Sequence, residues 1–268
     1  MVTDERAAES TDETTGETTG PDVESSPELE KAADAYEEYV AGELVLLEKR
    51  TKPFVDAVIA GDVERAKELY APAREPWERI EPIAAQLGDY DPEIDAREGD
   101  VPADEWGGFH RIEKALWVKG TTDGQKEHAR KLMEDVEHLR GEIGELELEP
   151  ADLVTGSVEL LNEVSAGKIT GEEERYSHTD LYDIQANVEG TEAAFDELKP
   201  EVAEEDSALA NDVEEGFDQV YEELDQYRRG DGWVSYEQLD ESDRRALSQK
   251  VDALAEPLSQ AGQVLEKN

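Results

Sequence analysis

A histidine and a glutamate three residues apart are the first candidates for chemistry in this chain. His110 and Glu113 lie in the segment GGFHRIEKALW, residues 107–117, which has the apolar spacing of a helix. Residues three apart are neighbours on one helix face, so both side chains can reach the same point. An imidazole nitrogen beside a carboxylate suits Zn²⁺, Mn²⁺ or iron. The alternative is an ordinary helix surface with a solvated glutamate.

The surroundings of this pair favour burial. Trp106, Phe109 and Trp117 flank it, and large apolar residues bury what lies between them. A buried carboxylate needs either hydrogen bonds or a cation. The same aromatic residues are equally consistent with simple packing of a helical core, so burial alone does not decide between the two interpretations.

A second candidate group is acidic and lies in REPWERIEP, residues 74–82. Glu75, Glu78 and Glu81 follow one another at spacings of three and therefore share a helix face. We expect Asp95, in the next loop, to fold back over that face. Several carboxylates with one imidazole favour Fe³⁺, Mn²⁺ or Ca²⁺ over soft metals. The alternative in so acidic a chain is a solvated face.

A third group lies in ITGEEERYSHTDLYDIQANVEG, residues 169–190. Glu174 and His178 are four apart, and Asp180 and Asp183 are three apart. The structural alternative is that Thr179 or Asp180 caps the helix that follows. The chain has no H-E-x-x-H and no G-x-S-x-G motif, so the residues indicate no catalytic arrangement and we expect no enzyme.

Helices must position these groups, because apolar residues recur with helical periodicity from about residue 28 and strand signals are nearly absent. Asp62 and Asp104 are the expected caps of two of them. Residues 88–104 are expected to form a polar loop. The three prolines near residue 77 are expected to break or bend their helix. Helices are expected near 28–60, 62–87, 105–118, 123–146, 151–166, 178–198, 201–229 and 239–266. This pattern predicts an all-α fold of two packed four-helix bundles, roughly residues 30–147 and 148–268.

The charge of the chain limits its partners. It has 71 acidic and 26 basic residues and a formal net charge of −45. Phosphate binding needs a basic surface, so nucleic acid is excluded as a partner and an anionic membrane surface is disfavoured. Such acidity indicates either disorder or a folded protein of a salt-rich cell, where ions screen the repulsion. The helical periodicity favours the second, halophilic interpretation.

The cysteine content, the apolar runs and the N-terminal residues bear on membrane insertion and export. The chain has no cysteine and no apolar run long enough to span a membrane, so we expect no membrane insertion. Residues 1–29 are rich in Thr, Ser, Glu and Asp and are expected to form a disordered acidic tether. We expect a leader with a lipid-modified cysteine to precede Met1 in the precursor.

The segments GFHRIEKALW and ITGEEERYSHTDLYDIQANVEG, in this order, resemble the imelysin-like family and most closely its EfeO-type iron-uptake proteins. The resemblance covers about residues 30–268. It places the family's H-x-x-E motif on His110 and Glu113. It implies that further metal ligands fall on Glu78, Glu81, Asp95 and Glu173. It also implies two four-helix bundles with a metal bound in the cleft between them.

The function that this resemblance implies is extracytoplasmic, cell-surface capture of iron, as Fe²⁺ or Fe³⁺, for delivery to a membrane permease. Zn²⁺ and Mn²⁺ are the alternative ions. Residues 1–29 are too short for the cupredoxin domain that some EfeO-type proteins carry, so iron oxidation is not expected here. Two other functions stay open: a metal-dependent peptidase of imelysin type, and a helical scaffold that binds a partner without metal.

Overall fold

The computed structural model describes residues 26–265, and these residues fold almost entirely into helices. Ser26 begins the first helix by accepting a hydrogen bond from the backbone N–H of Leu29. The elements are α1 (Pro27–Ala60), α2 (Val63–Ile80), η1 (Glu81–Leu87), α3 (Tyr90–Ile94), α4 (Gly108–Val118), α5 (Lys126–Glu142), η2 (Ile143–Glu145), α6 (Pro150–Ala166), η3 (Lys168–Thr170), α7 (Asp180–Glu205), α8 (Ser207–Asp225), β1 (Arg228–Arg229), β2 (Gly232–Trp233), η4 (Tyr236–Gln238) and α9 (Glu241–Leu265).

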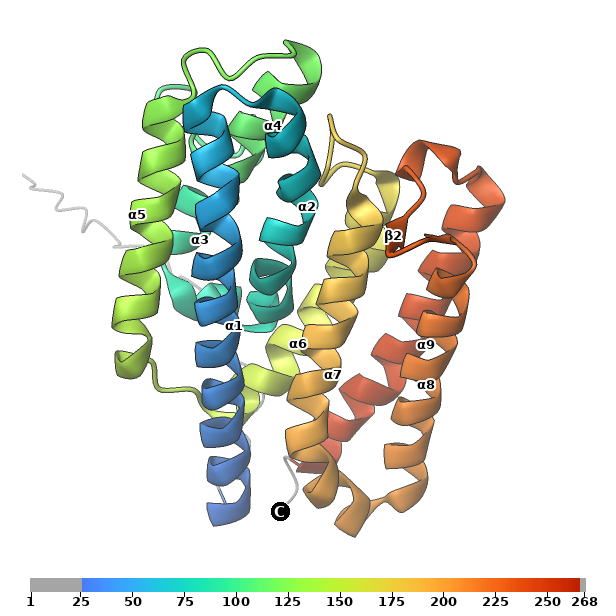
Figure 1. Cartoon of the computed structure of the whole chain (residues 1–268). Helices are drawn as coiled ribbons and strands as arrows, with labels where there is room; N and C mark the ends of the chain where they lie inside the picture. Colours follow the sequence, from blue (N-terminus) through green and yellow to red (C-terminus); the bar gives the residue numbers. More distant parts are fainter. Residues whose placement is uncertain (1–25, 266–268) are drawn as a thin grey trace, which may run out of the picture.

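The helices pack in two groups, which confirms the predicted all-α fold. In the first group α1 packs against α2 and α5, and α4 packs between α2 and α5. In the second group α9 packs against α6 and α8, and α7 lies against α6 and α8. The two groups meet mainly where α2 lies along α7 (Figure 1). None of the described helices is both long and apolar enough to cross a membrane.

Of the three prolines expected to break or bend their helix, two lie inside α2 without breaking it, and the third follows the end of α2 in η1. Pro76 has no N–H, so the carbonyl of Pro72, four residues earlier, loses its helical partner. The guanidinium of Arg50 donates to that carbonyl at 3.1 Å. The same guanidinium also pairs with Glu75. A side chain of α1 therefore replaces the missing backbone bond, and α2 carries its acidic residues on one continuous face up to Ile80.

Two glycines let the helix groups approach closely. A Cβ atom at Gly190 of α7 would lie 2.0 Å from the carbonyl oxygen of Arg79 on α2. A Cβ atom at Gly156 of α6 would lie 1.7 Å from the carbonyl oxygen of Pro82. Only a residue without a side chain fits at such contacts. The first contact holds α2 directly against α7, and the second holds η1 against α6.

Several sequence-based boundaries were wrong. The expected loop at 88–104 contains the short helix α3. The expected helix at 178–198 continues through Pro200 to Glu205, and Asp206 caps α8 by accepting from the N–H groups of two residues beyond it. The expected helix at 201–229 therefore begins at Ser207 and ends at Asp225, before the β1–β2 hairpin. Of the predicted tether at 1–29, residues 1–25 lie outside the described residues.

Candidate metal centre

The start of α4 brings His110 against Asp95. The cap is Gly107, and the prediction that Asp104 caps this helix was wrong. Gly108 has a φ of +68°, and a Cβ there would lie 2.2 Å from the carbonyl oxygen of Ile94. A side chain at Gly108 would push α4 away from the end of α3. The two glycines therefore set how near His110 comes to Asp95, which follows Ile94.

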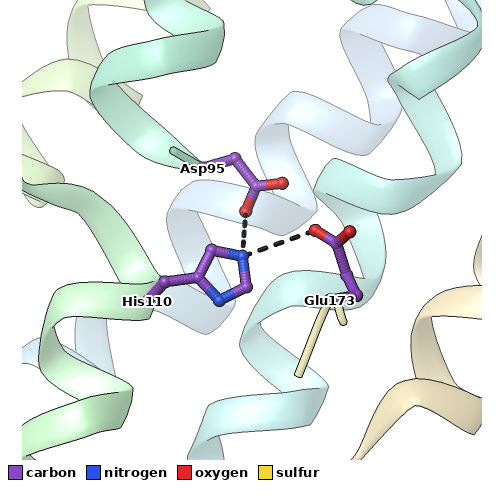
Figure 2. A group of neighbouring side chains, drawn as sticks. All are labelled: Asp95, His110 and Glu173. Carbon is purple, nitrogen blue, oxygen red and sulfur yellow. Dashed lines mark ion pairs between the residues drawn. The ribbon is translucent and has the colours of Figure 1, made fainter. Parts of the chain in front are cut away.

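One nitrogen of His110 faces two carboxylates. The Nε2 atom lies 3.5 Å from Oδ1 of Asp95 and 3.5 Å from Oε1 of Glu173 (Figure 2). All three residues are buried, and the three ligand atoms lie within 4.8 Å of one another. Within the described residues Nε2 has no hydrogen-bond partner. An imidazole and two carboxylates converging in this way can hold a divalent or trivalent cation.

The other nitrogen of His110 faces a second group of ligands. The Nδ1 atom lies 3.3 Å from Oε2 of Glu113 and 3.4 Å from the hydroxyl of Tyr70. The second oxygen of Glu113 accepts from the backbone N–H groups of Tyr176, at 2.9 Å, and Ser177, at 2.7 Å. His110, Glu113 and Glu174 form a second set whose ligand atoms lie within 4.8 Å of one another. His110 and Glu113, the pair predicted from their spacing, therefore lie together in this buried second set.

Glu78 and Glu81 lie in the same polar interior but contact other partners. The ammonium of Lys168 lies 2.9 Å from Glu78 and 2.5 Å from Glu81. The amide of Asn187 donates to the same carboxylate oxygens. Neither glutamate belongs to the two sets that converge on His110. Their role as metal ligands stays a prediction.

Arg74 is the centre of the ion pairs around this site. Its guanidinium is fully buried and pairs with Asp95 and with Glu78. Its Nε atom lies 2.7 Å from Oε1 of Glu174, and Nη2 lies 3.8 Å from Oε1 of Glu173. Arg74 thus contacts ligands from both sides of His110. The sequence analysis missed it, although it stands four residues before Glu78, the spacing of a helical ion pair.

Carboxylates outnumber bases in this interior. The bases are Arg74, Lys168 and His110, with Arg97 at the rim, where it pairs with Glu173 at 3.0 Å. The buried carboxylates that surround them are Glu78, Asp95, Glu113, Glu173, Glu174, Asp180 and Asp183. Burying unpaired carboxylates is costly unless they take up protons or bind a cation. The excess of carboxyl groups over bases is therefore the strongest feature of the site.

The pKa values of the buried carboxyl groups shift in opposite directions, according to whether a base or another carboxylate is the nearest neighbour. Burial opposes ionisation of Asp95, but Arg74 and His110 overcome it and lower its pKa to about 2. Burial likewise opposes ionisation of Glu173, whose pKa Lys168 and His110 hold well below its usual range. Burial and then the neighbouring Glu113 raise the pKa of Glu174 well above its usual range. Asp95 and Glu173 are thus ionised and ready to bind a cation.

His110 is stabilised in its charged form. Burial and the nearby Arg74 disfavour the imidazolium, but its contacts with Asp95, Glu113 and Glu173 raise its pKa well above the usual range. Metal ligation needs the neutral imidazole. A metal ion must therefore displace a proton from His110.

An acidic pocket of about 340 Å³ opens onto Asp95 and Glu173. It lies between η1 and α3 of the first helix group and α6 of the second. Its one basic lining residue is Arg97. Its acidic lining residues are Glu81, Asp91, Asp95, Asp100, Glu159, Glu163 and Glu173. A pocket with this lining attracts cations, and Asp95 and Glu173 belong both to the lining and to the set that faces Nε2 of His110.

The other residues of the predicted groups take different places. Glu75 pairs with Arg50, away from the site. His178 is partly exposed, and its Nε2 lies 3.7 Å from Glu237. Asp180 accepts a hydrogen bond from the N–H of Glu174 and so supports the second ligand set. Asp183 is buried beside Arg74.

Comparisons with known proteins identify relatives of this chain. The imelysin family model matches residues 32–261. The chain is 44% identical over 248 residues to an Efem/EfeO family lipoprotein of Staphylococcus haemolyticus, covering 91% of this chain and 86% of the relative. It is 47% identical over 238 residues to the iron uptake system component EfeO of Escherichia coli, covering 87% of this chain and 64% of that relative. The chain therefore spans less than two thirds of the Escherichia coli protein. These matches show that the chain belongs to the imelysin family.

Proposed function

We propose that this protein captures iron outside the cytoplasm and delivers it to a membrane permease. The observation that carries the proposal is the excess of buried carboxylates that converge with His110 at the foot of an acidic pocket. Hard, mostly oxygen ligands suit iron and Mn²⁺, and the single imidazole also admits Zn²⁺. The names of the relatives, an iron uptake component and a lipoprotein, support iron as the cargo and a lipid-anchored location.

The experiment that tests capture is a metal titration in about 2 M NaCl, where screening weakens loose binding to the acidic surface. The ions are Fe²⁺ (without oxygen), Fe³⁺, Zn²⁺ and Mn²⁺. His110→Ala removes the one imidazole of the site. His138→Ala is the matched control, because His138 is exposed on α5. We expect one tight site in the unaltered protein and in His138→Ala, and its loss in His110→Ala.

Equal binding by all three proteins would contradict the proposal and favour the partner-binding scaffold. A tight site with a strong preference for Zn²⁺ over both iron ions would overturn iron as the cargo. Delivery has its own test: a permease reconstituted in vesicles should take up iron faster from the loaded protein than from the same concentration of iron chelated by a small molecule.

A binding role is also favoured over a peptidase role by the contacts of Glu113. A general base needs a carboxylate oxygen free to take a proton from water. One oxygen of Glu113 accepts two backbone hydrogen bonds, and the other faces His110. We expect the metal-loaded protein to leave a mixture of unfolded peptides intact. Metal-dependent cleavage that Glu113→Gln abolishes would establish the peptidase instead.

A further inference from the structure

The buried guanidinium of Arg74 occupies the position of a cation among the proposed ligands. It pairs with Asp95, and it lies 2.7 Å from Glu174 and 3.8 Å from Glu173. These three carboxylates belong to the two ligand sets that share His110. A metal ion and Arg74 would therefore compete for the same oxygens, and their charges would repel each other.

Arg74 also has a partner that no ligand set uses. Asp183 on α7 is 1% exposed, and its Oδ1 lies 3.5 Å from Nε of Arg74. Within the described residues neither carboxylate oxygen of Asp183 has a hydrogen bond, and Nε of Arg74 has only its ion pair with Glu174. Burial and then the neighbouring Glu174 raise the pKa of Asp183 well above its usual range, so a cation that moved closer would favour its ionised form. A small rotation of the guanidinium toward Asp183 would satisfy both groups.

Aromatic rings hold the arginine while its anionic partners change. The guanidinium carbon lies 5.6 Å from the ring centre of Phe109 and 6.0 Å from that of Tyr70. Cation–π contacts at this distance do not depend on which carboxylate the guanidinium faces. Phe109 and Tyr70 therefore provide a constant surface on which Arg74 can turn.

We propose that Arg74 is a built-in counter-cation, which neutralises the ligand carboxylates in the metal-free protein and turns to Asp183 when a metal ion binds. This inference rests on the proposed function and explains how capture is reversible. Without Arg74 the metal-free site would hold repelling carboxylates, and the protein would release its metal only at a large cost in stability. Competition from Arg74 limits the metal affinity. When the metal ion leaves, Arg74 pairs with the ligand carboxylates again.

The test compares Arg74→Met with Arg79→Met. Arg79 lies on the same helix, pairs with Glu43 and Glu189, and contacts no ligand of His110. We expect Arg74→Met to bind the metal at least about tenfold more tightly than the unaltered protein, since a repelling charge is gone. We also expect its metal-free form to unfold at a lower urea concentration. Arg79→Met should leave the metal affinity unchanged.

Weaker or unchanged metal binding by folded Arg74→Met would overturn the inference. Folding of Arg74→Met only in the presence of metal would support it. Absence of tight binding in the unaltered protein would instead overturn the proposed function, so the two failures are distinguishable.

Asp183→Asn gives a second, independent measurement. Without Asp183 as an alternative partner, Arg74 stays paired with the ligand carboxylates and competes more strongly with the metal ion. We therefore expect the metal affinity to fall about threefold or more. The same substitution in an Arg74→Met background should have no effect on affinity, which a double-mutant cycle measures. Equal effects of Asp183→Asn in both backgrounds, or no effect in either, would overturn the role of Asp183. If Arg74→Met does not fold even with metal, Asp183→Asn alone decides.

Discussion

His110 is shared by the two proposed ligand sets, so its protonation state would link metal binding to pH. Each of its nitrogens faces a carboxylate, which favours the imidazolium form. The raised pKa of His110 means that its charge stabilises the fold. That contribution is complete below the pKa of the unfolded state and is lost as pH rises through the folded pKa. Metal affinity should instead increase as pH rises, because the metal ion needs the neutral imidazole.

We predict that metal binding releases a proton from His110 at pH 7. The affinity should rise about tenfold per pH unit as long as His110 is protonated before binding, because one proton and one metal ion compete. Calorimetric titrations in two buffers of different ionisation enthalpy measure the number of protons released. His138→Ala should release as many protons as the unaltered protein. A pH-independent affinity between pH 6 and about 8 would contradict this prediction.

The residues of the site show what sequence reasoning can and cannot find. Of the predicted ligands, the structure places Glu113, Asp95 and Glu173 around the imidazole of His110. Glu78 and Glu81 contact Lys168 instead. Arg74 and Lys168 were missed. Arg74 had a local signal, its spacing of four from Glu78. Lys168 pairs with Glu78 across a long stretch of chain, which no local pattern records.

At the scale of the helices, the close approach of α2 and α7 sets the geometry of the site. We predict that Gly190→Ala destabilises the protein by about 2 kcal/mol or more, because its Cβ would meet the backbone of Arg79 at 2.0 Å. The matched control is Gly42→Ala on α1, where a Cβ meets no atom within 4 Å. Gly42→Ala should stabilise the protein by about 0.5–1 kcal/mol.

Urea unfolding of both variants measures these changes in stability. The two glycines lie inside helices, so the helix-propensity gain is common to both and the difference reports the helix contact. A metal titration of Gly190→Ala adds a functional readout: separating α2 from α7 should weaken binding. Equal stability of the two variants would show that α2 and α7 separate without cost.

The helices themselves were predicted well, while their ends depended on tertiary contacts. Apolar periodicity is strong in long amphipathic helices, and the expected and observed ranges of α1, α6 and α9 agree closely. The start of α4 was misplaced because Gly108 packs against the carbonyl of Ile94, a contact made across a loop. The end of α7 was misplaced because Pro200 is accommodated inside the helix, which no local rule predicts.

At the scale of the whole molecule, the dominant feature is the net charge of −45. We predict that the melting temperature of the metal-free protein rises as NaCl increases from about 0.05 M to about 2 M, because screening weakens repulsion between surface carboxylates. KCl at the same ionic strength should act alike if screening is the cause. Circular dichroism during heating gives the measurement. A melting temperature that stays constant or falls would indicate that the surface charge does not limit stability.

The electric field of this negative charge should also guide cations into the acidic pocket. Glu159 and Glu163 of α6 line that pocket without belonging to the ligand sets of His110. We predict that Glu159→Gln/Glu163→Gln slows metal association about threefold at low salt and leaves the dissociation rate unchanged, because steering acts on encounter. The matched control is Glu204→Gln/Glu205→Gln, at the C-terminal end of α7, which removes the same charge elsewhere.

Stopped-flow mixing with the metal ion, followed by tryptophan fluorescence, measures both rates. In about 2 M NaCl the two double variants should associate at the same rate, since a Debye length of roughly 3 Å confines each charge to its own surroundings. Equal slowing by both variants at low salt would show that net charge alone attracts the cation. Slowing by the pocket variant alone makes the cleft between the helix groups the path by which the ion reaches His110.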